Sequence, residues 1–305
     1  MKKLYLILLL FSIKLMGQQD AYLSLIDYQM ALINPAHAGS DGQQNFRLNS
    51  RNQWMSIEDS PRTLSMAYSV ARAKNVGLGI SIISDEIFIE KQTFISLDFS
   101  YKLNLDQDKL LYFGIKGGLN SFKANTTNLT AYSPMSDPAK KDMSRLNPNV
   151  GVGMLFKNNQ HWFSMALPRL FNVNRNEEIF LNAKDRVHFY MAGGTSFKLN
   201  EEINLEPKFI HRSAQGIEAI TEGVIAANYK NKFDFGLGFR TGNVVSFKMN
   251  IDMGDIFSLS YAYDSYGGSN TIINQLNAHE IGLMIRLSKQ GENTAEETVA
   301  IDTSN

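Results

Sequence analysis

The chain has 305 residues, no cysteine, and 30 basic side chains against 30 acidic ones, so its formal net charge is zero. The lack of cysteine excludes disulfides, thiolate metal sites and a lipid-modified N-terminal cysteine. The balanced charge provides no field that would attract nucleic acid, so we expect no nucleic-acid partner.

Residues 1–17 have the pattern of a cleaved secretory signal peptide. Lys2 and Lys3 precede the apolar run Leu4–Ile13, and the small residue Gly17 follows shortly after that run. The run is about half the roughly twenty residues that a membrane-spanning helix needs. We therefore expect the mature chain to begin at Gln18.

Residues 18–43 are too apolar for a free tail and should pack against the rest of the protein. Pro35 and Gly39 predict a tight turn, and Asn34 is expected in an extended or capping geometry. Two placements fit: a plug inside a barrel, or a periplasmic lead-in that lies against the turns. The apolar residues of this segment are Tyr22, Leu25, Ile26, Tyr28 and Ala31.

Residues 44–288 read as about fourteen segments in which apolar and polar residues alternate, the weak repetitive pattern of a transmembrane β-barrel. Within Phe94–Leu103, Ile95 and every second residue after it are apolar, and the residues between them are polar. A period of two predicts a strand with unlike surroundings on its two faces. The predicted strands are Phe46–Gln53, Thr63–Val70, Val76–Ser84, Thr93–Leu103, Leu110–Phe122, Asn149–Lys157, His161–Leu167, Arg186–Leu199, Ile203–Arg212, Ile217–Tyr229, Phe233–Arg240, Val244–Asp252, Ile256–Asp264 and His279–Ser288.

The connections between these strands alternate in length, except that two outer ones, near Ser213–Gly216 and Thr241–Asn243, are short as well. Long ones are Lys123–Pro148, Pro168–Asp185 and Ser265–Ala278. Short periplasmic turns and long outer loops are typical of bacterial outer-membrane barrels, which have an even number of strands. The tight polar connections follow every second strand: Ala71–Asn75, Asp106–Lys109, Asn158–Gln160, Asn200–Glu202, Lys230–Lys232 and Met253–Asp255.

A chain that crosses a bilayer with strands must close its sheet, because lipid cannot satisfy the backbone of an open edge. The sequence therefore predicts an all-β fold, a transmembrane antiparallel β-barrel over residues 44–288. The apolar faces of its strands would meet lipid, and the charged faces would line a wet lumen in which opposite charges pair. Glycines spaced by two, such as Gly77 and Gly79, would relieve crowding, permit bending, or let a plug approach the wall. The alternative is a soluble β-sandwich with a charged outer face.

Several short motifs, in this order along residues 20–287, resemble the PorP/SprF outer-membrane proteins of the type IX secretion and gliding machinery of Bacteroidetes. They begin with Asp20-Ala21-Tyr22, Asn34-Pro35-Ala36-His37-Ala38-Gly39, Arg51-Asn52-Gln53-Trp54 and Pro61-Arg62-Thr63. They continue with Val76-Gly77-Leu78-Gly79, Phe113-Gly114-Ile115-Lys116-Gly117-Gly118, Tyr261-Ala262-Tyr263-Asp264 and His279-Glu280-Ile281.

The resemblance implies a non-enzymatic outer-membrane barrel that acts in type IX secretion, as partner or anchor for a secreted gliding adhesin or other large surface protein. Other family members act as core components that meet a periplasmic peptidoglycan-binding lipoprotein, and the sequence leaves both roles open. A small-solute porin is the alternative, because an open lumen and a filled one require similar strands. Outer-membrane lipid is the expected surrounding.

Residues proposed for partner binding or for the plug come from the N-terminal segment and the first strand. Trp54 is also read as an anchor at the membrane interface. Apolar residues in the long loops are candidate partner anchors: Tyr132, Met135, Phe171, Ile179 and Phe180. The proposed partner-binding or plug residues are Tyr22, Tyr28, Asn34, Pro35, His37, Gly39, Arg51 and Trp54.

The chain offers no pattern for catalysis. It has no Gly-x-Ser-x-Gly element, its histidines are dispersed, and adjacent His279 and Glu280 should point to opposite faces of a strand. We expect no catalytic residue, no metal site and no cofactor. Residues 289–305 are polar, without periodicity, and predict a disordered periplasmic tail.

Overall fold

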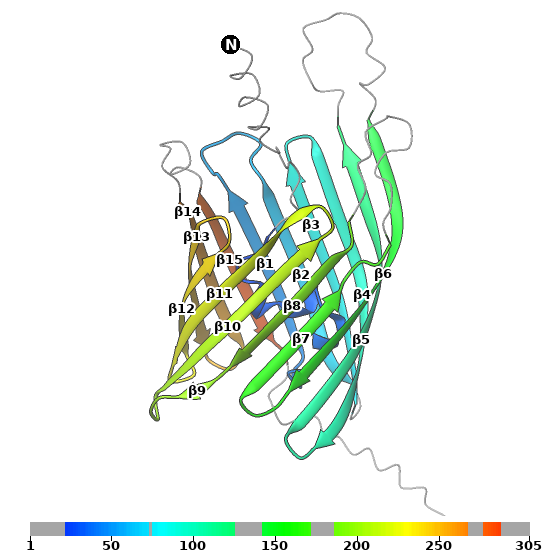
Figure 1. Ribbon diagram of the computed structural model, residues 1–305. Coiled ribbons are helices and arrows are strands. Elements are labelled where there is room, and N and C mark those ends of the chain that lie inside the picture. The colour runs from blue at the N-terminus through cyan, green and yellow to red at the C-terminus, as the bar shows by residue number, and fades with distance from the viewer. Residues whose placement is uncertain (1–21, 73–74, 126–141, 172–185, 268–276, 288–305) are drawn as a thin grey trace, which may run out of the picture.

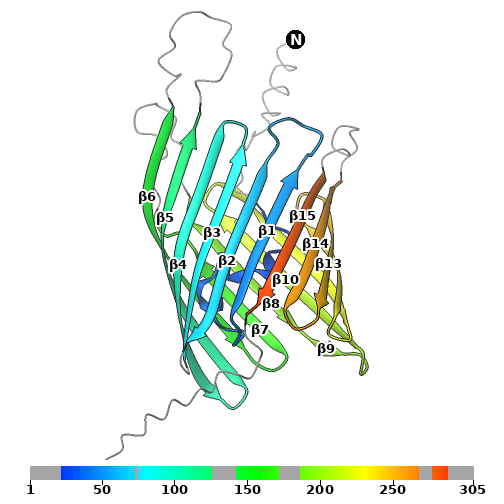
Figure 2. The same cartoon turned by 180° about the vertical axis from the view of Figure 1, so that it is seen from behind.

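The computed structural model describes residues 22–72, 75–125, 142–171, 186–267 and 277–287. Its sheet closes into a barrel, because β1 pairs with β2 on one side and with β15 on the other (Figures 1 and 2). The strands are β1 (Asn45–Gln53), β2 (Arg62–Arg72), β3 (Val76–Ile87), β4 (Glu90–Asp106), β5 (Lys109–Ala124), β6 (Met143–Lys157), β7 (His161–Leu167), β8 (His188–Thr195), β9 (Phe197–Lys198), β10 (Ile203–Ala214), β11 (Ile217–Tyr229), β12 (Phe233–Arg240), β13 (Val244–Met253), β14 (Phe257–Tyr266) and β15 (Asn277–Arg286).

The barrel wall of the described residues has 14 strand positions, all antiparallel, because β8 and β9 both pair with β10 and share one position. This confirms the predicted fold. The predicted strand Arg186–Leu199 is divided at Ser196, whose backbone N–H donates to the Gln160 carbonyl. Within the described residues, no helix has the length and apolar character needed to cross a bilayer.

Apolar and polar side chains alternate between the outer and inner faces of the strands, as predicted. On β4, Ile95 and Leu97 are 46% and 64% exposed on the outer face, whereas Ser96 and Asp98 between them are buried in the lumen. Apolar side chains that would be unfavourable in water are stable there because hydrocarbon surrounds the wall. Each strand thus separates lipid from a polar interior.

One predicted loop is wrong at both ends. The connection expected at Lys123–Pro148 is shorter, since β5 runs to Ala124 and β6 begins at Met143, with these two residues paired. Pro148 had argued against a strand here, because proline cannot donate a hydrogen bond to a neighbouring strand. The Val150 carbonyl faces β7, and Pro148, two residues earlier, faces the same side. Pairing with β7 has already ended at Leu167, so no hydrogen bond is lost.

One connection is shorter than predicted because the ends of the two strands that it joins are polar. The predicted gap after Ser84 is strand in the structure, and β3 and β4 are joined by a tight turn in which Phe88 has a φ of 55°. The strands β4 to β6 extend further at their outer ends than β10 to β13, so the rim is uneven (Figures 1 and 2). The signal peptide, the C-terminal tail, and the loop residues Tyr132, Met135, Ile179 and Phe180 lie outside the described residues.

The lumen holds residues Tyr22–Gly42, which we call the N-terminal segment (Figure 1). It contains three single 3₁₀ turns, η1 (Ile26–Tyr28), η2 (Met30–Leu32) and η3 (Pro35–His37). Its apolar side chains form the main hydrophobic cluster with wall residues such as Ala67, Ala192 and Ile210. The segment therefore gives this barrel a core that its polar wall could not form alone.

Candidate functional site: the lumen and its N-terminal segment

The N-terminal segment runs lengthwise through the barrel. At one end, the ring of Tyr22 lies 4.2 Å from the guanidinium of Arg240, the last residue of β12 before an outer connection. At the other end, Gly39 packs against Val70 and Ala71, next to a short turn. Since short turns are periplasmic in such barrels, the segment spans from the outer side to the periplasmic side.

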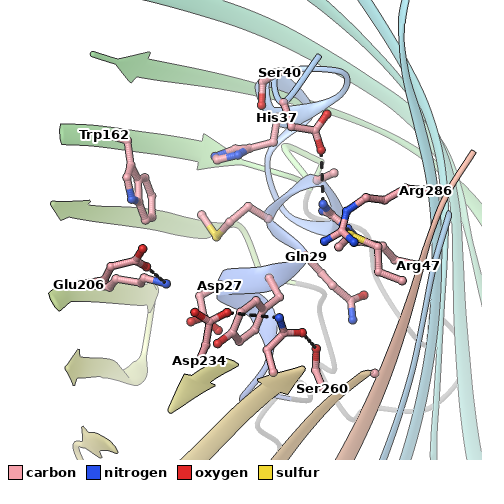
Figure 3. Close-up of a pocket in the computed structure, with 18 of the residues that line it drawn as sticks. Asp27, Gln29, His37, Ser40, Arg47, Trp162, Glu206, Asp234, Ser260 and Arg286 are labelled. Atoms are coloured by element: carbon pink, nitrogen blue, oxygen red, sulfur yellow. Dashed lines mark hydrogen bonds and ion pairs between the residues drawn. The ribbon is translucent and has the colours of Figure 1, made fainter. Parts of the chain in front are cut away.

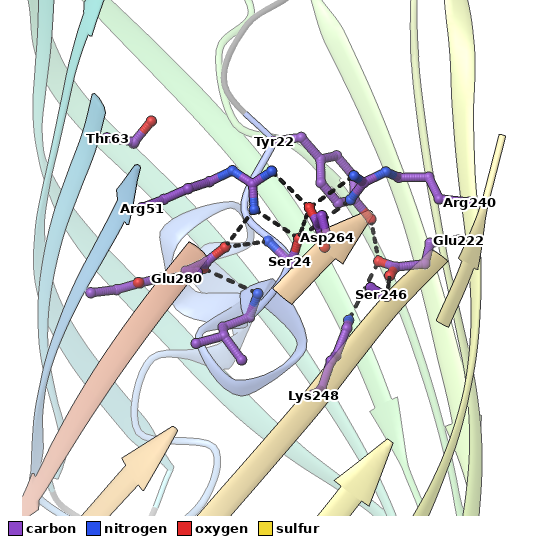
Figure 4. Close-up of polar contacts among 12 residues, drawn as sticks. Tyr22, Ser24, Arg51, Thr63, Glu222, Arg240, Ser246, Lys248, Asp264 and Glu280 are labelled. Atoms are coloured by element: carbon purple, nitrogen blue, oxygen red, sulfur yellow. Dashed lines mark hydrogen bonds and ion pairs between the residues drawn. The ribbon is translucent and has the colours of Figure 1, made fainter. Parts of the chain in front are cut away.

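Glu280 on β15 receives the backbone of the segment near its outer end (Figure 4). Its carboxylate accepts the N–H of Ser24 at 2.7 Å and the N–H of Leu25 at 3.1 Å. The same carboxylate accepts from Asn49 at 2.5 Å and from Arg51 at 3.1 Å, both on β1. One wall residue thus satisfies two consecutive main-chain donors and pairs with a buried cation.

Asp264 on β14 forms the second part of this network (Figure 4). One of its oxygens accepts from the Ser24 hydroxyl at 2.6 Å, from Arg51 at 2.7 Å and from Arg240 at 2.9 Å. Both guanidiniums also donate to the Ser24 oxygen, at 2.9 Å and 3.3 Å. The Ser24 hydroxyl therefore lies at the centre of three charged groups contributed by different strands.

Tyr22 and Glu222 form the third part. The Tyr22 hydroxyl donates to Glu222 at 2.6 Å, and burial together with this carboxylate raises the pKa of the phenol above its ordinary value. Glu222 also accepts from Ser246 at 2.6 Å and lies 3.4 Å from the Lys248 ammonium, which is 3.5 Å from Asp27. We call this whole set, from Glu280 to Lys248, the outer ion network.

The outer ion network is buried and nearly balanced in charge. Arg51, Asp264 and Glu280 have side chains that are at most 1% exposed. Buried charges are tolerated when they are paired and hydrogen-bonded, and removal of one partner leaves the others uncompensated. The arrangement therefore holds a polypeptide segment in one position.

A second set of contacts holds the middle of the segment. The Asn34 amide nitrogen lies 2.7 Å from the Ser164 hydroxyl and 3.0 Å from the Met154 carbonyl, while its oxygen accepts the Ala36 N–H at 2.9 Å. Asn34 has extended backbone and caps η3, as the sequence predicted. His37 completes this set, with Nε2 3.1 Å from the same Ser164 oxygen.

Inward-facing glycines let the segment approach the wall, which confirms that reading of the glycine spacing. A Cβ added to Gly77 would overlap the Ala38 carbonyl, and one added to Gly114 would overlap the backbone of Pro35 and Ala36. The buried Lys116 adjoins this contact, paired with Asp98 at 2.6 Å, and its ammonium donates to the Ala31 carbonyl at 3.3 Å.

Substitution of Gly114 by alanine is expected to destabilise the seated segment by about 1–3 kcal/mol, the usual effect of overpacking. Chymotrypsin should then cleave the N-terminal segment faster than in the unmodified barrel. Gly117→Ala, on the same strand, is the matched control, because a Cβ there meets nothing within 4 Å. Equal cleavage rates in the two variants would contradict the close packing.

The pKa of His37 is lowered to about 3 by burial and by the nearby cations Lys157 and Arg47, so the ring is neutral in the folded protein. An unfolded histidine has a pKa of about 6.5 and takes up its proton first as the pH falls. The stability that the neutral ring provides is thus complete above about pH 6.5 and is lost progressively towards pH 3, by up to about 1.4 kcal/mol per pH unit.

We therefore expect protease protection of the N-terminal segment to weaken over this pH range, and His37→Gln to flatten that dependence. Urea unfolding midpoints measured at several pH values would check it. If the unmodified protein and the variant responded to acid identically, His37 would have no part in the effect.

A cavity of about 410 Å³ lies on the periplasmic side of the segment (Figure 3). Asp27, Tyr28 and His37 of the segment face it, together with charged wall residues. Among these, Arg47 pairs with Asp41 at 3.4 Å. The remaining charged wall residues around it are Lys157, Glu206, Lys208, Asp234, Asp252 and Arg286.

Two cavities that Tyr22 lines lie on the outer side of the segment. The larger, about 500 Å³, is lined by Trp54, Glu218, Arg240 and Tyr266 around Tyr22. The smaller, about 100 Å³, is mainly apolar and lies between the segment and the wall. The segment therefore lies between a cavity on the periplasmic side and cavities on the outer side.

The structure brings together some of the predicted site residues and separates others. Tyr22 and Arg51 belong to the outer ion network, Asn34, Pro35 and His37 to the middle contacts, and Gly39, with a φ of 65°, to the turn at the periplasmic end. Tyr28 lies in the periplasmic cavity, with Lys208 5.5 Å from its ring. Trp54 lines the larger outer cavity.

Sequence reasoning missed Ser24, Asp264 and Glu280 as site residues. The last two stand in the motifs Tyr261–Asp264 and His279–Ile281, each of which places one acid on the inward face. As predicted, His279 points away from Glu280, and its ring nitrogen lies 2.8 Å from the Tyr261 hydroxyl. In the part of the chain that the structure describes, no three His, Asp or Glu side chains group as metal ligands do.

Comparison with solved structures finds outer-membrane barrels of very different sequence. The CymD monoaromatic hydrocarbon channel is 8% identical, with 89% of this chain and 94% of that chain covered and a TM-score of 0.52. The toluene transporter TbuX of Ralstonia pickettii is 9% identical, with coverages of 83% and 91% and a TM-score of 0.49. The CymD similarity shows a shared fold alone.

Comparison with curated protein sequences gives no significant match. The family model for the type IX secretion system membrane protein PorP/SprF matches residues 15–285, which is most of the chain. The match includes the N-terminal segment and the whole barrel except the last residue of β15, Arg286. The chain therefore belongs to the PorP/SprF family of type IX secretion system membrane proteins and is located in the bacterial outer membrane.

Proposed function

We propose that this chain is a non-enzymatic component of type IX protein secretion that acts as partner or anchor for a secreted gliding adhesin or another large surface protein. Family membership supports the secretion role. The observation that carries the rest is the N-terminal segment, which lies along the lumen and is fixed by the buried outer ion network. We propose that it closes the barrel.

A filled lumen favours a binding role over transport of solutes. A porin needs a continuous water-filled path, whereas an anchor can have its interior filled. Leu25, Asn34 and Ala36 of the segment are fully buried, so they are covered on all sides by other parts of the segment or by the wall. A segment packed in this way would leave little cross-section for ions.

The outer face offers the surface on which a partner would bind. The larger outer cavity opens between β1 and the β12–β13 connection, where the rim is low (Figure 1). Phe171, one of the candidate anchors, lies four residues after the end of β7 and is 50% exposed. Aromatic side chains are common anchors at protein interfaces.

Affinity capture from native outer membranes after mild detergent extraction tests this function. With a tag on the C-terminus, we expect a large secreted protein to copurify, and we expect deletion of Tyr22–Gly39 to abolish its retention. Heat-modifiable migration in gel electrophoresis controls for folding of the shortened barrel. Gly117→Ala, which leaves the lumen unchanged, should retain the partner.

Other outcomes would favour the other roles. Recovery of a periplasmic peptidoglycan-binding lipoprotein in place of a surface protein would assign the chain to the core machinery. Recovery of neither, together with a steady ion current, would favour a small-solute porin. Either outcome would overturn the anchor proposal.

A further inference from the structure

Two outer connections of the barrel form one concave surface. The β1–β2 connection, residues 54–61, and the tip of the β3–β4 hairpin lie side by side at the outer rim (Figures 1 and 2). The Phe88 N–H donates to the Asp59 carbonyl at 3.2 Å, which joins the two connections. Between them lies a groove of about 450 Å³, which we call the rim groove. Its apolar lining residues are Met55, Ile57 and Phe88.

The rim groove lies beyond the part of the wall that faces lipid. On the outer face of β4, the next exposed side chain after Ile95 towards the rim is that of Lys91, which pairs with Glu86 at 3.6 Å. Charged side chains are unfavourable in hydrocarbon, so this ion pair marks the outer edge of the lipid. Both connections extend past it, because β2 begins opposite Glu86 and the hairpin tip follows it. The exposed fractions beyond this edge are 65% for Met55, 48% for Ile57 and 58% for Phe88.

The backbone around the rim groove is held in an unfavourable conformation. Trp54, Asp59 and Phe88 have φ angles of 53°, 55° and 55°, a left-handed conformation that bulky side chains rarely adopt. The Trp54 N–H donates to the Asn277 carbonyl at 2.8 Å, which ties the β1–β2 connection to β15. Strain of this kind persists only where the surrounding structure imposes it, and it is concentrated at binding sites. The groove therefore presents its apolar side chains in a fixed arrangement.

The charges of the rim groove indicate the chemistry of its partner. Glu58 and Asp59 are exposed, and within the described part of the chain neither side chain has an ion-pair partner. Glu86 also lines the groove, whereas Arg62 is the one cation in its lining. The surface is therefore net acidic, which disfavours anionic lipid head groups and favours a basic partner.

We propose that the rim groove binds a segment of the secreted partner in which lysine or arginine side chains flank apolar ones. The apolar side chains would cover Met55, Ile57 and Phe88, which water otherwise surrounds. The basic side chains would pair with Glu58 and Asp59. Residue 87, next to Phe88, lines the larger outer cavity, so the groove continues the outer surface described above. This inference rests on the proposed anchoring function and specifies where the partner binds.

Site-specific photocross-linking in whole cells tests the contact. The photoreactive residue p-benzoylphenylalanine replaces Ile57 in the tagged chain, and it replaces Leu146, 64% exposed near the outer end of β6, in a matched control. We expect an adduct with the surface protein from position 57 and none from position 146. Sequencing of the adduct should give a peptide with both apolar and basic residues. An adduct with lipid alone, or with a peptide that has no basic residue, would overturn the proposal.

Charge reversal gives a second measurement. Glu58→Lys with Asp59→Lys should lower the yield of the adduct at position 57 about tenfold, because like charges would then face each other. Glu201→Lys with Glu202→Lys, at an exposed periplasmic turn, is the control and should leave the yield unchanged. If affinity capture recovers the surface protein but position 57 gives no adduct, or if charge reversal has no effect, the groove is not the contact and the anchoring function stands. If no surface protein is captured, both proposals fail.

Discussion

Replacement of Arg51 by methionine is expected to lower the free energy of unfolding of the barrel by about 3–5 kcal/mol, the range for a buried ion pair that loses one partner. Arg51 is 1% exposed and pairs with Asp264 at 2.7 Å and Glu280 at 3.1 Å. Both carboxylates would remain buried with less compensation, although they also hold Ser24. Urea titration of the protein in lipid vesicles measures the change.

Lys91→Met provides the control on an exposed ion pair. Lys91 and Glu86 lie 3.6 Å apart with side chains 53% and 58% exposed, so their pair should contribute about 0–1 kcal/mol. The Arg51 variant should also expose the N-terminal segment to protease, whereas the Lys91 variant should not. Similar small effects from both substitutions would show that the outer ion network does not hold the segment.

Deletion of Tyr22–Gly39 is expected to convert a barrel with little ion current into one with large, steady single-channel conductance. The described wall of 14 strands surrounds a polar interior, and the apolar core within it comes largely from the segment. Without that core, water and ions would fill the lumen, as in wider barrels. Recordings in planar bilayers measure the conductance of each form.

Gly114→Ala and Gly117→Ala serve as matched variants in the same recordings. The first should raise the frequency of open events by loosening the segment, and the second should leave the current unchanged, because only the first side chain would meet the segment. A large steady conductance in the unmodified protein would rule out closure by the segment. In that case a porin function would be favoured.

The barrel could be predicted because the signal is periodic and local. Alternation with period two specifies a strand and its two faces without knowledge of its neighbours. The sorting of tight and long connections then gave the orientation. Predictions failed where the pattern ends. The strand tip Met143–Pro148 has no regular alternation of apolar and polar residues, and Phe88 turns with a left-handed backbone that normally favours Gly or Asn, so no turn residue marked the turn.

The candidate site was only partly predictable because it depends on register. Barrel closure makes β14, β15 and β1 neighbours, which brings the motifs of Asp264, Glu280 and Arg51 to one part of the wall. Their meeting requires that Arg51 pair directly with Glu280, and the structure has this register. A shift of one residue would turn one of them to lipid. The apolar residues of the N-terminal segment indicated that it packs against the barrel. The contacts that Ser24 of this segment makes with the charged wall residues had no signal in the sequence.

A cysteine cross-link tests most directly whether the N-terminal segment lies in the lumen. The natural chain has no cysteine, and a Cβ built at Gly79 lies 3.3 Å from the Cβ of Ala38, near the roughly 3.5–4.5 Å that a disulfide requires. In native outer membranes, Ala38→Cys with Gly79→Cys should form a disulfide, whereas Ala38→Cys with Leu78→Cys, on the lipid face, should not. Absence of the first cross-link, while both thiols react with a maleimide, would contradict the placement of the segment.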